Sequence, residues 1–259
     1  MPYIHYTKQG SKGPTLVFLH GFCDNQELWS EFVAPFLETY QVFTLDLPGF
    51  GKSEILPVPF TLDQIGDEVA EWLTEQKLGK SLIVGHSLGG YVALSLLDRY
   101  PKLISGIVLF HSTPLPDLPE RKAIRNKVID FVNQHGVEPY IETFVPGLFA
   151  DKSDPHILTT RERTRATRPA PLVGYAAAMR DRPDRSATVI AGHRPVLIIG
   201  GIKDSLISID QLREIAEKSP KCELFELEKA AHMGIFEAKT ECQAIISGFA
   251  ARTFKDSHF

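Results

Sequence analysis

One serine lies in a short pattern of small residues that suits nucleophilic chemistry. Ser87 has Gly85 two positions before it and Gly89 two positions after it. The pattern directly follows an apolar run at residues 81–85 and precedes a helical pattern at 91–100. A serine on a sharp strand-to-helix turn has a strained backbone that neighbouring chain approaches closely, so its neighbours must be small. We therefore expect Ser87 to be a nucleophile at a helix N-terminus, where the helix dipole favours a developing oxyanion.

A serine hydroxyl needs a base, and the base needs an orienting group. His232 follows a strand-like run at residues 223–227 and precedes a final helical pattern, which places it at the carboxyl end of a strand. We expect His232 to be this base. His86 adjoins Ser87, but adjacent residues on a sharp turn point in different directions, so we interpret His86 as a packing residue. Three other histidines come before any suitable acid in the chain: His111, His135 and His156.

The candidate for the orienting acid is Asp204, just past the apolar run at residues 195–200. A carboxylate there can accept a hydrogen bond from the imidazole N–H and hold the productive tautomer. The order serine, acid, histidine is the order of nucleophile-elbow hydrolases. Asp117, after the preceding strand, is the alternative acid.

Acyl transfer also requires donors for the oxyanion. Gly21 follows the apolar run at residues 15–20 and allows a tight turn, so that the backbone N–H of Phe22 can point into the site. The second donor would be the N–H of Leu88, the residue after the nucleophile.

Short apolar runs alternate with amphipathic stretches along most of the chain. The runs are residues 15–20, 41–45, 81–85, 104–110 and 195–200. Near-continuous apolar strands are typical of a parallel sheet that is covered on both faces. Thr61 and Gln64 form a capping box that opens a helix, which we expect Gly79 to end. This alternation predicts an α/β fold with a doubly wound, mostly parallel sheet.

The middle of the chain interrupts this alternation. Between residues 114 and 192 no long buried-strand run appears, and apolar residues recur at helical spacing in 121–134 and 137–149. We expect three parts: residues 1–113 as the first part of the core, 114–192 as a helical cap and 193–259 as the second part of the core. The glycine-rich loop at residues 46–53 lacks the spacing of a phosphate-binding loop and is interpreted as a structural turn.

Composition limits the class of protein. Of 259 residues, 43% are hydrophobic and 23% are charged, which is typical of a globular domain. A net charge of −4 argues against a general nucleic-acid binder, and no apolar run is long enough to span a membrane. Three cysteines without CxxC spacing and an N-terminus unlike a signal peptide lead us to expect a cytoplasmic protein. The oligomeric state stays open.

Five ordered motifs together resemble the α/β-hydrolase superfamily, in particular small carboxylesterases and lactonases with a helical cap. They are residues 20–22, 46–53, 85–90, 200–204 and 230–234. The resemblance covers residues 3–113 and 193–255. It implies a catalytic triad of Ser87, Asp204 and His232, and an oxyanion hole made by Phe22 and Leu88. It also implies that the helical insertion covers the pocket and that no cofactor or metal is needed.

The predicted function is that of a serine hydrolase that cleaves a small-molecule carboxylic ester or lactone through an acyl-enzyme. Three alternatives share the fold and triad: a carbon–carbon bond hydrolase, a cofactor-free perhydrolase and a small-molecule receptor with very slow turnover. Haloalkane dehalogenases and epoxide hydrolases carry aspartate at the nucleophile position, so Ser87 argues against both.

An arginine cluster in the predicted cap suggests a further hypothesis about the substrate. The cluster is Arg161, Arg163, Arg165 and Arg168. If these side chains faced the pocket, they would favour acidic esters through charge-assisted pairing. If they faced away from it, they would form a solvated helix face.

Overall fold

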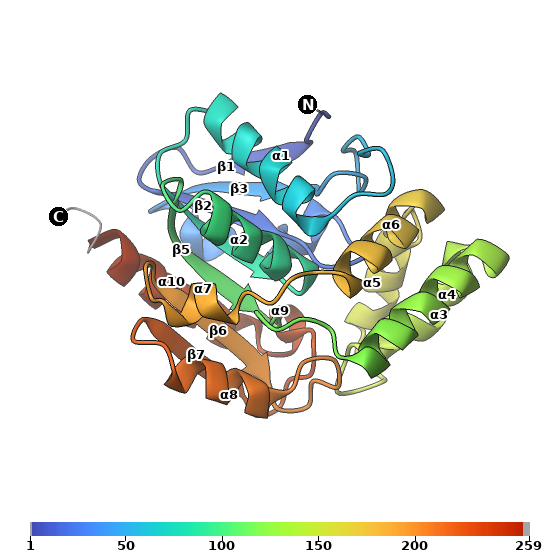
Figure 1. Ribbon diagram of the computed structural model, residues 1–259. Helices are drawn as coiled ribbons and strands as arrows, with labels where there is room; N and C mark the ends of the chain where they lie inside the picture. The colour runs from blue at the N-terminus through green and yellow to red at the C-terminus, as the bar shows by residue number, and fades with distance from the viewer. Residues whose placement is uncertain (1, 256–259) are drawn as a thin grey trace.

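The computed structural model of the protein describes residues 2–255, and a seven-stranded sheet lies at its centre (Figure 1). The strand order is β1-β3-β2-β4-β5-β6-β7, and only β1 runs antiparallel to its neighbour. The strands are β1 (Tyr6–Gln9), β2 (Thr15–Leu19), β3 (Gln41–Leu45), β4 (Ser81–His86), β5 (Ile104–Phe110), β6 (Val196–Gly201) and β7 (Cys222–Leu227). The predicted α/β fold with a mostly parallel sheet is confirmed.

Burial explains why the inner strands could be recognised from apolar runs. Every residue of β2, β4, β5 and β6 is buried, whereas the edge strand β7 alternates between half-buried and exposed positions and is buried only at Leu227. The register pairs Leu19 with Gly85, Gly85 with Leu109 and Phe110 with Ile199. The carboxyl ends of these four strands therefore meet at one edge of the sheet, and the loops that follow them lie together.

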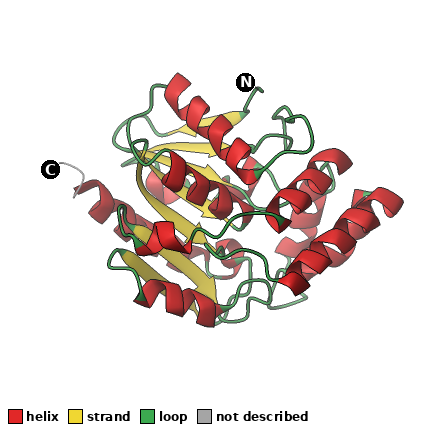
Figure 2. Ribbon diagram, viewed as in Figure 1, coloured by secondary structure: helices red, strands yellow, loops and turns green. Residues whose placement is uncertain are grey.

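Helices cover both faces of the sheet (Figures 1 and 2). Four helices lie in a row on the face nearer the viewer in Figure 1: α1 (Leu62–Glu75), α2 (Leu88–Arg99), α7 (Ser186–Ile190) and α8 (Ile209–Glu217). The other face is covered by α10 (Lys239–Lys255) together with the short helix η1 (Gln26–Trp29). Two further short helices are η2 (Ala34–Phe36) and α9 (Gly234–Glu237).

Helix α1 begins as predicted and ends earlier than predicted. The Thr61 side chain accepts a hydrogen bond from the Gln64 N–H at 3.2 Å, and the Gln64 side chain accepts one from the Thr61 N–H at 2.8 Å. The expectation that Gly79 ends the helix is wrong, because Lys77 takes the left-handed conformation (φ 54°). Leu78 packs against the core and its N–H donates to the Leu73 carbonyl, so the chain must turn before it reaches the glycine.

Five α-helices lie between β5 and β6 in the chain. They are α3 (Pro119–His135), α4 (Val137–Gly147), α5 (His156–Thr164), α6 (Pro169–Arg180) and α7. The first four lie beyond the carboxyl ends of the strands, on the right in Figures 1 and 2. Helix α5 was not foreseen, because its buried face consists of Ile157, Thr160 and Thr164, and two threonines give little apolar periodicity.

Polar contacts fasten the insertion to the loops that follow β2 and β3. The Arg163 guanidinium on α5 binds the Asp24 carboxylate with two nitrogens, one of them at 2.9 Å from Asp24 Oδ2. The Thr167 hydroxyl donates to the Cys23 carbonyl at 2.8 Å, and the Tyr175 hydroxyl donates to the Pro48 carbonyl at 2.9 Å. These contacts hold the insertion over the edge of the sheet where the strands end.

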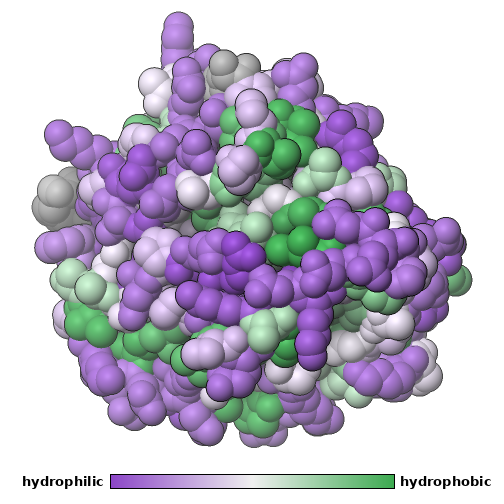
Figure 3. Space-filling model, turned by 45° about the vertical axis from the view of Figure 1, so that its right-hand side comes forward, coloured by the Kyte–Doolittle hydropathy of each residue, from purple (hydrophilic) through white to green (hydrophobic). Residues whose placement is uncertain are grey.

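The surface of the insertion side is largely hydrophilic, with small separated hydrophobic patches (Figure 3). Within residues 2–255, no helix has the length and apolarity needed to cross a membrane. None of the three cysteines is paired, and Cys23 and Cys242 are buried.

Candidate active site

Ser87 lies on a strained turn between β4 and α2. Its φ of 49° is in the left-handed region, which side chains other than glycine rarely adopt. The turn is held from β5 and the loop after it: the Ser87 N–H donates to the Phe110 carbonyl at 2.9 Å, and the Ser112 hydroxyl donates to the Ser87 carbonyl at 2.8 Å. Such strain is typical of functional sites, where the surroundings fix one side-chain direction.

The glycines around Ser87 are required by close backbone contacts. A Cβ on Gly85 would lie 2.3 Å from the Gly89 carbonyl carbon, and one on Gly89 would lie 2.4 Å from the Leu19 carbonyl oxygen. Backbone atoms inside a sheet cannot move aside as a flexible side chain can. The spacing of small residues in the sequence therefore has a steric cause at each position.

His232 and Asp204 meet at the carboxyl edge of the sheet. His232 Nδ1 lies 2.7 Å from Asp204 Oδ2. The other carboxylate oxygen accepts from the backbone N–H groups of Leu206 at 2.8 Å and Ile207 at 3.2 Å. Because a carboxylate only accepts, His232 Nδ1 carries a proton and Nε2 is free to take one. The alternative acid, Asp117, lies elsewhere and pairs with arginines.

The surroundings of Asp204 favour its ionised form. Burial alone would raise the pKa of this carboxyl, but the neighbouring imidazole and hydrogen bond of His232, together with the nearby ring of His111, lower the pKa of Asp204 well below its usual range. Asp204 therefore stays negative at neutral pH, as a group that orients an imidazole must.

The loop that carries His232 is held by Glu237 of α9. One oxygen of this carboxylate accepts from the N–H groups of Ala231 at 3.0 Å and Met233 at 3.2 Å, and the other accepts from Ala150 at 2.7 Å. The His232 N–H donates to the Leu148 carbonyl at 2.9 Å. The loop is thus connected to the end of the α4 segment of the insertion.

His86, at the end of β4, also holds the loop that carries His232. Its Nε2 lies 2.9 Å from the His232 carbonyl oxygen and therefore donates to it. Burial, together with the nearby imidazoles of His232 and His111, holds the pKa of His86 well below its usual value. A neutral imidazole that donates to a backbone carbonyl agrees with the interpretation of His86 as a packing residue.

Ser87 and His232 line one small cavity of about 20 Å³. Its apolar wall includes Phe144, Val145 and Leu148 from the insertion. Besides Ser87 and His232, its polar lining residues are Asp24, His86, Thr160 and Thr164. Across the described residues, no hydrogen bond joins the side chains of Ser87 and His232. Such bonds are often long without substrate and tighten when substrate binds.

The turn of Gly21 and Phe22 lies against the nucleophile. A Cβ on Gly21 would lie 3.6 Å from the Ser87 Cβ, and it would lie 2.6 Å from His86 Nδ1. Leu88 is the first residue of α2, so its N–H has no partner within the helix. In the part of the chain that the structure describes, no hydrogen bond occupies the N–H of either Phe22 or Leu88.

His20 fixes the conformation of that turn. Its Nδ1 donates to the Gly21 carbonyl at 2.8 Å, and its Nε2 accepts from the Leu47 N–H at 2.9 Å. Leu47 belongs to the loop at residues 46–53, which was predicted to be a structural turn near the oxyanion loop. The loop contains Gly49 and Gly51 with positive φ, at 92° and 51°.

The arginine cluster does not reach the cavity. Arg161 and Arg165 pair with the Glu142 carboxylate, Arg163 pairs with Asp24, and Arg168 donates to backbone carbonyls. None of the four lines the cavity that holds Ser87. The hypothesis that they select acidic esters is therefore wrong: each is engaged in holding the insertion together or in place.

A second imidazole faces Asp204. His111 directly follows β5, and its Nδ1 lies 3.4 Å from Asp204 Oδ2. The order of residues in the sequence argued against His111, because Asp204 comes 93 positions later, and only the pairing of β5 with β6 brings the two together. Its position directly after a buried strand was the one available signal.

The donor atoms of His111, Asp204 and His232 lie within 4.8 Å of one another, which raises the question of a metal ion. The 2.7 Å separation of His232 Nδ1 from Asp204 Oδ2 is a hydrogen-bond distance. Two ligands about 2.0 Å from a tetrahedral ion lie roughly 3.3 Å apart. The pair is therefore arranged to share a proton rather than to bind an ion between them.

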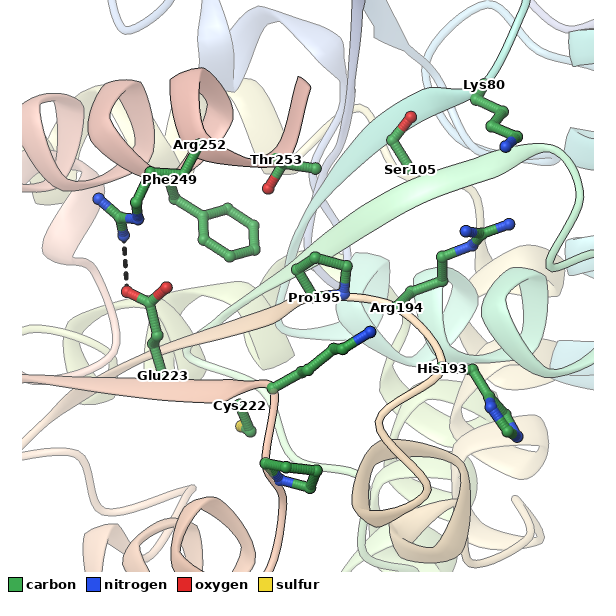
Figure 4. A pocket seen from close by; sticks show the side chains of 12 residues that line it. Lys80, Ser105, His193, Arg194, Pro195, Cys222, Glu223, Phe249, Arg252 and Thr253 are labelled. Atoms are coloured by element: carbon green, nitrogen blue, oxygen red, sulfur yellow. Dashed lines mark hydrogen bonds and ion pairs between the residues drawn. The ribbon is translucent and has the colours of Figure 1, made fainter. Parts of the chain in front are cut away.

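A wider pocket of about 420 Å³ lies at the amino ends of the strands, away from Ser87 (Figure 4). Ser105 and His193 both line it, but Figure 4 shows Arg194 between them and the imidazole pointing away from the hydroxyl. The serine and the histidine of this pocket therefore do not form a nucleophile–base pair, and the smaller cavity is the candidate active site.

Comparisons with known proteins agree with this architecture. A family model described as "alpha/beta hydrolase fold" matches residues 14–134. The chain is 28% identical to a pimeloyl-[acyl-carrier protein] methyl ester esterase of Aeromonas hydrophila over 92% of this chain and 96% of that protein. It is 27% identical to the dihydrolipoyllysine-residue acetyltransferase component of an acetoin cleaving system of Pseudomonas putida, over 88% of this chain. The chain spans 61% of the length of that relative.

Among solved structures, a thermophilic esterase from Thermogutta terrifontis superimposes with a TM-score of 0.90 at 24% identity, over 97% of this chain and 94% of the other. These findings confirm the resemblance to the α/β-hydrolase superfamily. The chain has the α/β-hydrolase fold, and its relatives include an esterase.

Proposed function

We propose that the protein is a serine hydrolase that cleaves a carboxylic ester or lactone. The observation that carries this proposal is the 2.7 Å contact between His232 Nδ1 and Asp204 Oδ2, beside a strained Ser87 in one cavity. The esterase among the relatives supports ester cleavage. Fold alone would not, because function depends on the site rather than on the fold.

In the proposed reaction, Ser87 Oγ attacks the ester carbonyl carbon while His232 Nε2 takes the hydroxyl proton. The N–H groups of Phe22 and Leu88 stabilise the oxyanion. The intermediate collapses, the C–O bond of the ester breaks, and His232 gives the proton to the leaving alkoxide. Water, activated by His232, then cleaves the acyl-enzyme and releases the acid. Asp204 stays ionised throughout.

We further propose that residues 114–192 act as a cap between the core parts at 1–113 and 193–259. Phe144, Val145 and Leu148 of this segment form the apolar wall of the cavity. The chain length of the best ester would measure the space that these side chains leave for the acyl group.

The test is hydrolysis of p-nitrophenyl esters from acetate to decanoate by the wild type and by Ser87→Ala. We expect turnover of at least one of these esters by the wild type and a loss of roughly 10⁴–10⁶-fold in kcat for Ser87→Ala, as in other triad enzymes. Ser153→Ala is a matched control, because Ser153 is exposed and lies outside the cavity. Its activity should equal that of the wild type.

Turnover that survives in Ser87→Ala would show that the nucleophile is wrong. A folded wild type that cleaves none of the esters would contradict ester hydrolysis. Cleavage of a diketone, or tight binding without turnover, would then identify a carbon–carbon bond hydrolase or a receptor. Peroxide-dependent halogenation would identify a perhydrolase.

A further inference from the structure

The carboxylate of Asp204 has two imidazole neighbours. His232 Nδ1 lies 2.7 Å from Asp204 Oδ2, and His111 Nδ1 lies 3.4 Å from the same oxygen. The His111 side chain is completely buried, and that of Asp204 is 1% exposed. The second neighbour of Asp204 Oδ2 is therefore the buried His111 ring and not a solvent molecule.

The backbone of α9 determines which nitrogen of His111 carries the proton. The Gly234 N–H donates to His111 Nε2 at 3.1 Å, so Nε2 must be an unprotonated acceptor. In a neutral ring the proton is then on Nδ1, which faces Asp204. Burial lowers the pKa of His111 despite the nearby carboxylate, in agreement with a neutral ring. The Nδ1–H of His111 thus lies 3.4 Å from the oxygen that His232 uses, close enough for an electrostatic interaction but without the geometry of a well-formed hydrogen bond.

The backbone of His111 is strained in the same way as that of Ser87. Its φ is 50°, although its N–H still donates to the Ile199 carbonyl at 2.8 Å at the end of the β5–β6 ladder. A Cβ on Gly234 would lie 2.5 Å from His111 Nε2, so the ring is closely packed on its far side as well. Strain at an imidazole that is held from both sides is a sign of function rather than of poor packing.

We propose that His111 is a positioning residue that acts on His232 through Asp204. Its Nδ1–H, 3.4 Å from Asp204 Oδ2, offsets part of the negative charge of the carboxylate through its dipole and can close to a hydrogen bond when that charge is needed. His232 then holds its catalytic proton less tightly than it would beside an unshared carboxylate. This role deepens the proposed function and rests on it.

Four titratable groups surround His232, and they come from four elements. Asp204 follows β6, His111 follows β5, His86 ends β4, and Glu237 lies on α9. The Glu237 carboxylate is occupied by three backbone N–H groups, and His86 donates to the His232 backbone. Loss of the His111 donor would therefore act mainly through Asp204.

Two substitutions separate the two contacts of His111. In His111→Asn the amide nitrogen replaces Nδ1, so the donor toward Asp204 is kept, and asparagine tolerates a positive φ. In His111→Gln the amide lies near the position of Nε2, so the contact with Gly234 is kept and the donor toward Asp204 is lost. The measurement is kcat/KM for p-nitrophenyl acetate from pH 5 to 9.

We expect His111→Gln to move the acidic limb of the profile to higher pH by about 0.5–1 unit, as expected when a carboxylate loses a donor. The limb of His111→Asn should stay close to that of the wild type. An unmoved limb in His111→Gln, or equal movement in both variants, would overturn the proposal.

A measurement on the wild type tests the proposal even if a variant does not fold, or if the protein cleaves no ester. Nitrogen-15 NMR of the histidine rings should show His111 as the Nδ1–H tautomer at pH 7. An Nε2–H tautomer would overturn the role of His111 and leave the role of Ser87 untouched. Conversely, a lack of ester turnover together with the Nδ1–H tautomer would count only against ester hydrolysis.

Discussion

Thr160 brings a hydroxyl to the wall of the cavity that holds Ser87. The residue is 1% exposed, and its Oγ1 has no hydrogen-bond partner within residues 2–255. An unpartnered buried hydroxyl costs about 1–3 kcal/mol of stability. Because this cost arises at the wall of the candidate active site, we expect the Thr160 hydroxyl to bind a polar group of the substrate.

Thr160→Val removes the hydroxyl and nearly keeps the shape of the side chain. We expect the free energy of unfolding to rise by about 1 kcal/mol, because no hydrogen bond is lost. We also expect kcat/KM to fall more for a hydroxyacyl ester than for the plain alkyl ester. Urea unfolding and the two substrates test both points.

Thr159→Val on the same helix is the control, because Thr159 is exposed and its hydroxyl donates to the His156 carbonyl. It should change neither selectivity nor cavity shape. A Thr160→Val protein that is less stable than the wild type would contradict the idea of a free hydroxyl.

Some site residues could be found from the sequence and others could not. Ser87 has a local signature, because its glycines are fixed by contacts between residues only a few positions apart or in the adjoining strand. Asp204 and His232 were inferred from strand ends, and the structure brings them together. His111 and Thr160 have no local signature, since strand register and helix packing alone bring them to the site.

Helix α5 depends on one buried ion pair for its place. Arg163 and Asp24 are 11% and 7% exposed in their side chains, and the guanidinium binds the carboxylate with two nitrogens. If only one partner is removed, an uncompensated charge is left in a buried place, which is costlier than the absence of both.

Arg163→Met should therefore lower the free energy of unfolding by about 3–5 kcal/mol. Addition of Asp24→Asn should restore part of the loss, because the unpaired charge disappears. Urea unfolding of the single and double variants gives the comparison. Arg165→Met is the matched control: Arg165 is 45% exposed in its pair with Glu142, so little change is expected.

Equal losses of stability in Arg163→Met and Arg165→Met would show that burial of the Arg163–Asp24 pair does not increase its contribution to stability.

The elements that sequence patterns identified are those with one-sided or complete burial. The inner strands appear in the sequence as continuous apolar runs because all their residues are buried. Helix α1 appears as a helical repeat of apolar residues because only one of its faces is buried. The edge strand β1, with exposed residues in its middle, has no such pattern and was not foreseen. Helix boundaries depend on which residue reaches the core first, as Leu78 shows at the end of α1.

Three buried histidines make the stability of the whole molecule depend on pH. Burial lowers the pKa of His20, His86 and His111 below the ordinary value of 6.5. In the unfolded chain these rings take up protons near pH 6.5, whereas in the folded protein they stay neutral. The contribution of these three neutral rings to the free energy of unfolding is therefore fully present above pH 6.5 and decreases as the pH falls below that value.

We expect the free energy of unfolding to fall between pH 7 and pH 5 with a slope of up to about 4 kcal/mol per pH unit, for three protons. Urea unfolding at half-unit steps measures the slope. His111→Gln removes one of the three groups, so its slope should be smaller by about one third. A slope near zero in the wild type would mean that the folded protein also binds these protons.

The small volume around Ser87 has a kinetic consequence. A cavity of about 20 Å³ holds one or two water molecules and is too small for an ester, so substrate must enter while the insertion stands partly open. Apparent affinity then falls in proportion to the population of the open form. We therefore expect the Arg163–Asp24 pair, which fastens the insertion, to limit the rate of substrate capture. A variant with weaker contacts between the insertion and the core should be less stable and have a higher kcat/KM. A variant with the insertion cross-linked to the core should be more stable and have a lower kcat/KM.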